Sequence, residues 1–192
     1  MIIIVSVDFK LAIDPKILTK FTAAPDVVNK AFNLAISRAL DKARTTLTRE
    51  TVKQYYIGAS DIRKTITAKT IATNGLKQGV LTSKGERLHL SKFKISPKSP
   101  SYRMKGRNYQ AAVKRSGGLK SLAPNAFYIP SKKQAFRRIA PGGRGFQNLR
   151  VLMGPAIPQI LKNEQTLDVA TRETQNVFTE RLSHEVQRLL FA

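Results

Sequence analysis

Residues 26–56, DVVNKAFNLAISRALDKARTTLTRETVKQYY, carry a long periodic apolar pattern that begins just after Pro25. The apolar positions are Val28, Ala31, Phe32, Ala35, Ile36, Ala39, Leu40, Ala43 and Leu47. Spacing of three, four and seven residues places these side chains on one face of a helix, and Asp26 is a residue type that favours the N-cap position. We therefore expect a helix over about 26–54 that serves as the spine of the fold.

A second periodic stretch closes the chain, in residues 163–191, NEQTLDVATRETQNVFTERLSHEVQRLLF. It contains neither proline nor glycine, which would interrupt a helix. Its apolar positions are Leu167, Ala170, Val177, Phe178, Leu182, Val186, Leu189 and Leu190. The pattern predicts a second long amphipathic helix.

Between the two helices, a break at Gly58 precedes a short predicted helix with Ser60 as its N-cap and with Ile62 and Ile66 on one face. Beyond it the apolar period falls to two, which is typical of strands, and glycine and proline pairs separate the segments. The expected strands cover 66–73, 79–83, 87–95, 109–115, 126–130, 134–139 and 148–153. The opening residues, Ile2 to Phe9, also read as a strand.

These elements predict an α+β fold in which an antiparallel sheet packs against a long N-terminal helix and a long C-terminal helix. With 192 residues and 42% apolar content, the chain is expected to form a single domain over 1–192. The apolar stripes predict which side chains the core buries against the sheet. They are Phe32, Ile36, Leu40, Val151 and Leu182.

Charge is the dominant feature of the composition, with 34 Lys and Arg against 12 Asp and Glu and a net charge of +22. Residues 87–163 contain 17 Lys or Arg and no Asp or Glu. A surplus of this size favours a polyanion or an acidic protein as the partner. The chain has no cysteine and no apolar run long enough to cross a membrane, so we expect no thiolate metal site, no signal peptide and no membrane partner.

The residues that enzymes use for acid–base or metal chemistry are sparse. His89 and His184 are the only histidines, and both are expected to be structural. The carboxylates form no D-x-D, H-E-x-x-H or other paired cluster. The stretch APGGRGF, 140–146, lacks the Lys-Ser/Thr of a phosphate-binding loop and leads into a strand pattern. We expect no enzyme, no metal and no cofactor.

The basic centre is therefore the candidate contact surface for DNA or for a protein partner. The candidate residues are Arg103, Lys105, Arg107, Lys114, Arg115, Lys132, Lys133, Arg137, Arg138 and Arg144. Tyrosine and phenylalanine interleave with these charges and could stack on bases, although aromatic residues in strands are more often core residues. The segment 96–110, SPKSPSYRMKGRNYQ, has four basic residues and few apolar ones, which predicts a mobile basic loop.

Five fragments in order resemble the minor tail protein Z family of tailed bacteriophages. They are NLAISRALDKART, IRKTI, LHLSKFKISPK, NAFYIPSKKQAFRR and LRVLMGPAIPQIL. The family carries Ser in its GPS-x-P corner, where this chain has Ala156, and the strand Ile2 to Phe9 matches no family motif.

The resemblance implies a structural tail-completion subunit without enzymatic activity. Such a subunit would close the head-proximal end of the tail as a homo-oligomeric ring, most simply a hexamer. Its partners would be other tail or neck proteins and the DNA in the lumen, and it would be located in the virion tail after assembly in the host cytoplasm. The segment 134–155 would form a hairpin with basic tips that ends in a proline corner.

The basic charge leaves a second interpretation open, namely a free-standing protein that binds nucleic acid without sequence specificity and is associated with ribosomes or compacts chromosomes. Two long apolar-striped helices offer more packing surface than a small binding module needs, which favours the first interpretation. A nuclease is disfavoured because the sequence offers no metal-ligand cluster.

Overall fold

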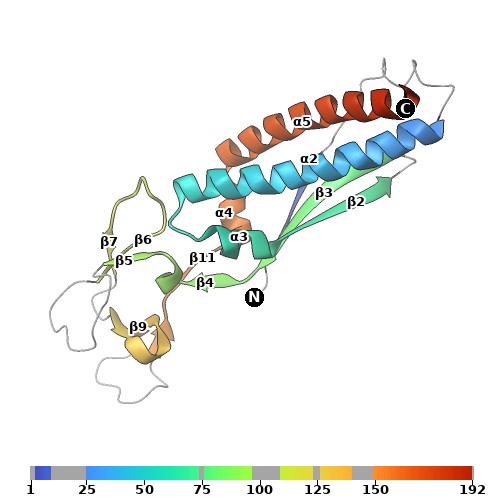
Figure 1. The fold of residues 1–192 in the computed structure, drawn as a ribbon. Coiled ribbons are helices and arrows are strands. Elements are labelled where there is room, and N and C mark those ends of the chain that lie inside the picture. The colour runs from blue at the N-terminus through green and yellow to red at the C-terminus, as the bar shows by residue number, and fades with distance from the viewer. Residues whose placement is uncertain are drawn as a thin grey trace.

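The computed structural model describes residues 3–9, 25–73, 76–96, 109–122, 126–139 and 149–191. Two long helices lie side by side along one edge of the molecule, α2 (Pro25–Gln54) and α5 (Glu164–Phe191) (Figure 1). Both predicted long helices are thus confirmed. The predicted α+β class is also confirmed, because every strand pair among the described residues is antiparallel.

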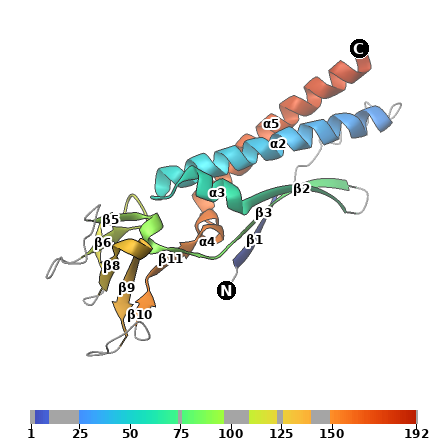
Figure 2. The ribbon, with the colours of Figure 1, turned by 60° about the horizontal axis from the view of Figure 1, so that its bottom comes forward.

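Strands β1 (Ile3–Phe9), β2 (Ile66–Thr73) and β3 (Leu76–Gly85) form the sheet that α2 covers, in the order β1-β3-β2. The pairing of β2 with β3 runs from Ile66 opposite Ser83 to Thr73 opposite Leu76. Residues 74 and 75, where we expected the turn, lie outside the described residues. The layers are therefore the sheet, then α2, then α5 (Figures 1 and 2).

One face of α2 packs on α5. Phe32 meets Phe178 edge to face, with ring centroids 5.4 Å apart. Farther along the helix, the Thr46 hydroxyl donates a 2.8 Å hydrogen bond to the Glu173 carboxylate. Between these contacts, Ala35 and Ala39 continue the alternating spacing of three and four residues, so they share this face and both are fully buried.

A different face of α2 packs on the sheet. A Cβ atom built on Gly79 of β3 would lie 2.9 Å from Leu40 Cδ2 and 3.3 Å from Ile36 Cγ1. Glycine at this position therefore lets the helix approach the strand closely. Phe32, Ile36, Leu40 and Leu182 are buried as predicted, and Ile36 and Leu40 do pack on the sheet. Phe32 instead packs on α5, the helix that carries Leu182, so burial of these two against the sheet was wrong. Val151 is only half-buried because it lies in a small sheet away from this core.

The short helix α3 (Ala59–Thr65) follows α2, and its N-cap is Gly58 rather than the predicted Ser60. No side chain caps its first turn, and extended backbone at Gly58 serves as the cap instead. Ile62 is fully buried on α3, as its spacing suggested. Ile66 lies outside this helix, because the backbone becomes extended there and begins β2.

The remaining strands gather at the other end of the molecule (Figure 2), where we expected parts of one sheet. They instead form three small sheets. The strands are β4 (Arg87–His89), β5 (Lys94–Ser96), β6 (Gln110–Ala112), β7 (Lys120–Ser121), β8 (Ala126–Ile129), β9 (Gln134–Arg138), β10 (Leu149–Val151) and β11 (Met153–Ala156). Their pairings are β11-β4, β5-β6-β7 and β10-β9-β8.

Several strand boundaries differ from the predicted ones. The expected strand 87–95 is interrupted by the 3-10 turn η1 (Leu90–Lys92), because Leu90 turns inward to become buried. The expected strand 148–153 divides at Leu152, which leaves one sheet and enters the next. The expected strand 109–115 is reduced to β6, while β7 and the turn η2 (Pro130–Lys132) were not anticipated.

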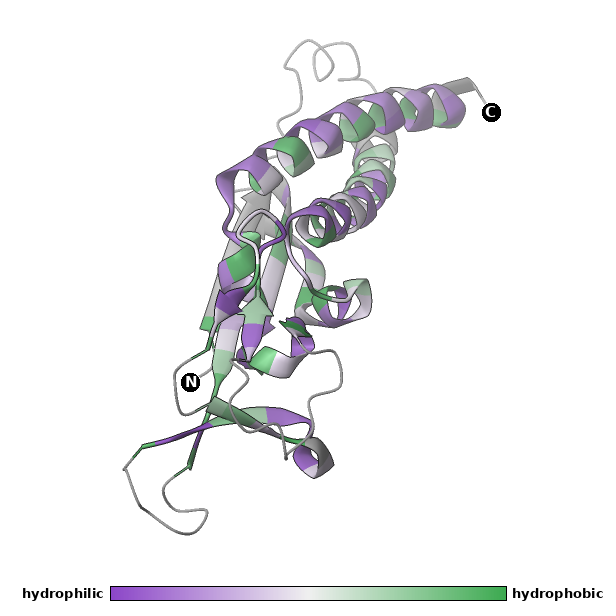
Figure 3. Ribbon diagram, turned by 90° about the vertical axis from the view of Figure 1, so that its left-hand side faces the viewer, coloured by the Kyte–Doolittle hydropathy of each residue, from purple (hydrophilic) through white to green (hydrophobic). Residues whose placement is uncertain are grey.

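Helix α4 (Ile157–Leu161), which was not predicted, links this region to α5. Its side chains Ile157, Ile160 and Leu161 are buried, and the helix packs against β1 and β3. Figure 3 shows hydrophilic and hydrophobic residues alternating along both long helices. Among the described residues, no helix has the length and apolar content that a membrane span requires.

Phe178→Ala should lower the free energy of unfolding by about 3–5 kcal/mol, because it leaves a cavity beside Phe32 in a region without solvent access. Chemical denaturation followed by circular dichroism measures the change. Val169→Ala is the matched control on the same helix, where the side chain is 38% exposed, and it should change stability little. Equal effects of the two substitutions would contradict the packing described for α2 and α5.

Stability should also depend on pH through Glu173, which links α5 to α2. The pKa of Glu173 lies below its ordinary value near 4.5. The hydrogen bond from Thr46 is the largest cause, and the bonds from Lys42 and Arg49 add to it. A lowered folded-state pKa means that the carboxylate stabilises the fold above the ordinary pKa. This contribution is lost as the pH falls through the lowered folded-state pKa.

Glu173→Gln should therefore reduce the free energy of unfolding at neutral pH by up to about 1 kcal/mol, since the carboxylate is 32% exposed and partly screened by solvent. The difference from the unmodified protein should vanish near pH of about 2, where the carboxyl is protonated in both states. Glu180→Gln, at an exposed position of the same helix, serves as the control. A deficit that stayed constant from neutral to acid pH would disprove the ionic role of Glu173.

Candidate nucleic-acid interface

The three small sheets and their turns form what we term the basic body, residues 87–96, 109–122, 126–139 and 149–156. Its described residues include eleven Lys or Arg, and all eleven are exposed. They are Arg87, Lys92, Lys94, Lys114, Arg115, Lys120, Lys132, Lys133, Arg137, Arg138 and Arg150. Lys92 pairs with Asp61 of α3 at 3.3 Å.

Two acidic residues, in contrast, are paired within the helical layer. Glu173 bonds Arg49 at 2.7 Å and Lys42 at 3.3 Å. Glu50 pairs with Lys53 at 2.8 Å, and this contact lowers its pKa. These two carboxylates thus already have partner cations on α2.

The basic body has a small core of its own that keeps its strands in place. Phe93 and Phe136 are buried, and the Phe93 ring packs directly over Gly154. A Cβ atom at Gly154 would lie only 2.4 Å from Phe93 Cε2, so a larger residue could not occupy this position without displacing the ring. Leu152 joins two sheets, because its N–H donates to Ala135 O and its carbonyl accepts from Leu90 N–H.

Two predicted contact residues, Lys114 and Arg115, connect the basic body to the end of α2. Arg115 Nε donates a 2.9 Å hydrogen bond to Val52 O, which is one of the last carbonyls of the helix. An arginine is favourable at this end because the helix dipole is negative there. Lys114 pairs with Tyr55 in an isolated antiparallel bridge. Both residues therefore have a structural role.

Aromatic rings of this junction lie beneath several cations. Lys94 Nζ lies 5.0 Å and Arg115 Cζ 4.7 Å from the centroid of the Tyr56 ring, so one ring faces two positive charges. Lys114 Nζ lies 5.9 Å from the Tyr55 ring. The negative face of an aromatic ring attracts a cation, which partly offsets the mutual repulsion of these side chains.

The other predicted contact residues within the described part lie on and before β9. Lys132 and Lys133 form the exposed connection between β8 and β9, and Lys133 adopts a left-handed backbone with φ of 50°. Arg137 and Arg138 follow on β9 and point to opposite faces of the sheet, as successive strand residues do. Arg138 Cζ lies 5.5 Å from the Phe127 ring centroid.

Arg103, Lys105, Arg107 and Arg144 lie outside the described residues, as does most of the predicted basic loop 96–110. At the ends of that segment, Ser96 belongs to β5 and pairs with Gln110 of β6. Tyr109 is buried. The candidate list therefore divides into residues that the structure places and residues that it does not describe.

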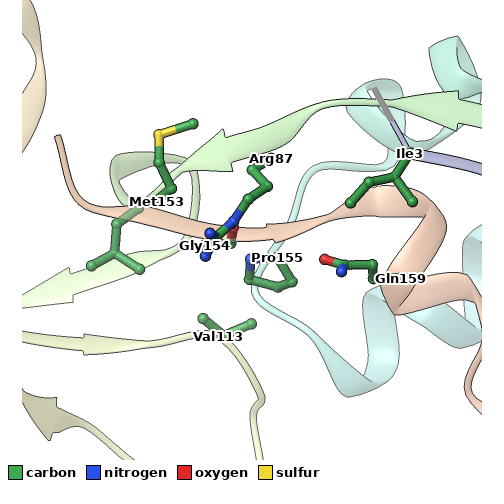
Figure 4. A pocket seen from close by; sticks show the side chains of 8 residues that line it. Ile3, Arg87, Val113, Met153, Gly154, Pro155 and Gln159 are labelled. Carbon is green, nitrogen blue, oxygen red and sulfur yellow. The ribbon is translucent and has the colours of Figure 1, made fainter. Parts of the chain in front are cut away.

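Arg87 and Arg150 line hollows in the basic body, although no sequence pattern distinguishes them from other cations. Arg87 extends from β4, and its Nε donates a 3.2 Å hydrogen bond to Gly154 O. The guanidinium reaches into a hollow of about 550 Å³ that is also lined by Ile3, Val113 and Gln159 (Figure 4). A smaller hollow of about 220 Å³ brings Arg87 together with Arg137 and Arg150.

The two histidines lie in different surroundings. Gln134 Nε2 donates to His89 Nε2 at 3.2 Å, while His89 Nδ1 is buried without a hydrogen-bond partner among the described residues. His184 is exposed on α5 beside Glu185. Within the described ranges, no three His, Asp or Glu side chains come together as metal ligands would.

Comparison with protein-family models, curated proteins and solved structures finds no match for this chain. The candidate surface therefore depends on the geometry and charge of the residues themselves.

Tyr56→Leu should lower the free energy of unfolding by about 1 kcal/mol or more, because it removes the ring that faces Lys94 and Arg115. Tyr56→Phe is the matched variant, since it keeps the ring and loses only the hydroxyl. Denaturant titration at low salt should place the Phe variant near the unmodified protein and the Leu variant clearly below it. Indistinguishable stabilities for the Phe and Leu variants would show that the cation–π contacts contribute nothing.

Proposed function

We propose that this chain is a structural subunit that completes the head-proximal end of a bacteriophage tail, the role implied by its resemblance to minor tail protein Z. The observation that carries the proposal is the separation of charge along the molecule. Glu50 and Glu173 pair with cations within the helical layer, whereas the basic body exposes eleven Lys or Arg, and residues 87–163 contain no Asp or Glu. DNA passes through a tail, so such a subunit would meet phosphates without reading base sequence.

Assembly into a ring requires two different surfaces on each subunit, because a head-to-tail interface joins unlike patches. The helix pair and the basic body are unlike in secondary structure and in charge. In the proposed role the subunit forms a ring, most simply a hexamer, that contacts other tail or neck proteins. The same role requires no catalytic group and no cofactor.

A second candidate function is that of a free-standing protein that binds nucleic acid without sequence specificity. It is favoured by the exposed strand arginines, of which Arg138 lies against the Phe127 ring. Such a protein would act without any assembled particle. Loss of the protein should therefore prevent assembly of phage particles only if the first function is correct.

Deletion of the coding sequence from its phage or prophage should yield separate heads and tails in electron micrographs, because the tail end is left unfinished. Expression of the unmodified chain in trans should restore joined, infective particles. The double variant Arg137→Gln/Arg138→Gln tests whether exposed cations of β9 take part, with Arg172→Gln/Lys162→Gln as the charge-matched control outside the basic body.

Normal yields of joined and infective particles in the deletion strain would overturn the tail role. If the same purified protein still bound duplex DNA with a steep salt dependence, the free-standing function would replace it. Complementation by the unmodified chain but not by the β9 variant would support the tail role and assign the basic body to it.

A further inference from the structure

Three arginines from three separate strands meet at one hollow of the basic body. Arg87 comes from β4, Arg137 from β9 and Arg150 from β10, and all three line a space of about 220 Å³. The rest of the lining comes from Val151, Leu152 and Met153. The site thus combines three permanent positive charges with an apolar wall.

The register of the sheet forces two of these charges together. Arg137 and Arg150 are directly opposite each other on β9 and β10, so their side chains leave the same face of the sheet. Like charges at directly opposite positions destabilise an antiparallel pair. Among the described residues, neither arginine has a hydrogen-bond or ion-pair partner, and residues 87–163 contain no Asp or Glu.

Arg87 is held in place while its outer nitrogens remain available. Its Nε donates to Gly154 O at 3.2 Å, and this bond fixes the plane of the guanidinium beside β11. Gly154 is itself fixed by the Phe93 ring packed against it. One side of the site is therefore preorganised, which reduces the entropy lost when a ligand binds.

We propose that this arginine hollow is a binding site for a phosphoryl group. Guanidinium groups present paired N–H donors that match the oxygens of phosphate and carboxylate. A planar carboxylate has two oxygens and is satisfied by one or two forks, which would leave the third arginine unpaired. A tetrahedral phosphoryl group directs its oxygens in several directions and can pair with forks that arrive from three strands. The apolar wall lowers the local dielectric and strengthens these charge-assisted bonds.

The phosphoryl group could belong to a nucleic-acid backbone or to free phosphate. The backbone source rests on the DNA contact proposed above, whereas the hollow itself does not. If the hollow bound no phosphate, the proposed role in joining heads and tails would be unaffected. If the tail role were wrong, the hollow would still bind phosphate. The two proposals can therefore fail separately.

The test measures binding of inorganic phosphate, inorganic pyrophosphate, a poly-glutamate peptide and a fluorescent 20-base-pair duplex DNA to the purified full chain at fixed ionic strength. Arg150→Gln should weaken duplex binding by about tenfold, because it removes charge-assisted hydrogen bonds. Arg150→Lys retains the positive charge but lacks the paired N–H donors of a guanidinium, so it should weaken duplex binding nearly as much. Arg172→Gln, an exposed arginine on α5, is the control and should bind almost as the unmodified protein does.

Stability provides a second measurement that also checks folding. Without ligand at low salt, Arg150→Gln should be as stable as the unmodified protein or more stable, because one of two opposed cations is removed. Phosphate or pyrophosphate should raise the melting temperature of the unmodified protein and of Arg172→Gln, but not that of Arg150→Gln. A rise with these small anions identifies the hollow as sufficient for free phosphate, and a response to the duplex alone identifies the nucleic-acid backbone as the source.

Three results would overturn the proposal. Equal duplex affinity of the Lys variant and the unmodified protein would show that only total charge matters. Equal losses in Arg150→Gln and Arg172→Gln would show that the hollow is no different from the rest of the surface. Binding of a poly-glutamate peptide, with no response to phosphate or DNA, would assign the hollow to an acidic protein partner instead.

Discussion

The whole structure depends on the close approach of α2 to neighbours on two of its faces. On the face toward α5, Ala35 and Ala39 present only methyl groups, so the helices can come together until Phe32 meets Phe178. On the face toward the sheet, the missing side chain of Gly79 admits Leu40 and Ile36. Small residues on one side of each contact and large residues on the other give an interlocked core without strain.

The end of this same helix determines where the basic body sits. Tyr56 N–H donates to Val113 O, and Arg115 N–H donates to Gln54 O, so the chain just after α2 pairs with the chain after β6. Arg115 adds its side-chain bond to Val52 O. From the opposite direction, α4 packs its apolar residues against β1 and β3. The basic body is thus joined to the helical layer at the end of α2, where β3 leads into β4, and where β11 leads into α4.

The sequence predicted the long elements well because one signal, the apolar period, extends over many residues in each. In α2 the spacing from Phe32 to Leu47 distinguishes buried from exposed positions, and both Ile36 and Leu40 are buried as expected. The short elements were harder to predict. At Leu90 the strand ends in a 3-10 turn, although polar and apolar residues continue to alternate in the sequence. At Leu152 the chain passes from one sheet to the next, although that residue is neither glycine nor proline.

The candidate surface could be predicted as a region but not as a site. Counting charges in 87–163 identifies a basic segment, yet it gives Arg87 and Arg150 no more weight than any other cation. Their meeting with Arg137 depends on the pairing of β9 with β10 and on the path of β4, which are long-range features. Conversely, Arg115 looks like a surface contact in the sequence, but the structure uses it to bind the end of a helix.

The distance along the chain between α2 and α5 has a consequence for the order of folding. Thr46 and Glu173, which bond across the two helices, are 127 residues apart, whereas Thr73 and Leu76 pair across a two-residue connection. Closing a long loop costs more entropy than closing a hairpin, so we expect the pair β2–β3 to form before the helix pair. During synthesis, we therefore expect the alanine face of α2 to stay uncovered until the 28 residues of α5 have left the ribosome. A chain that stops before residue 164 would keep that face open to association with other unfinished chains.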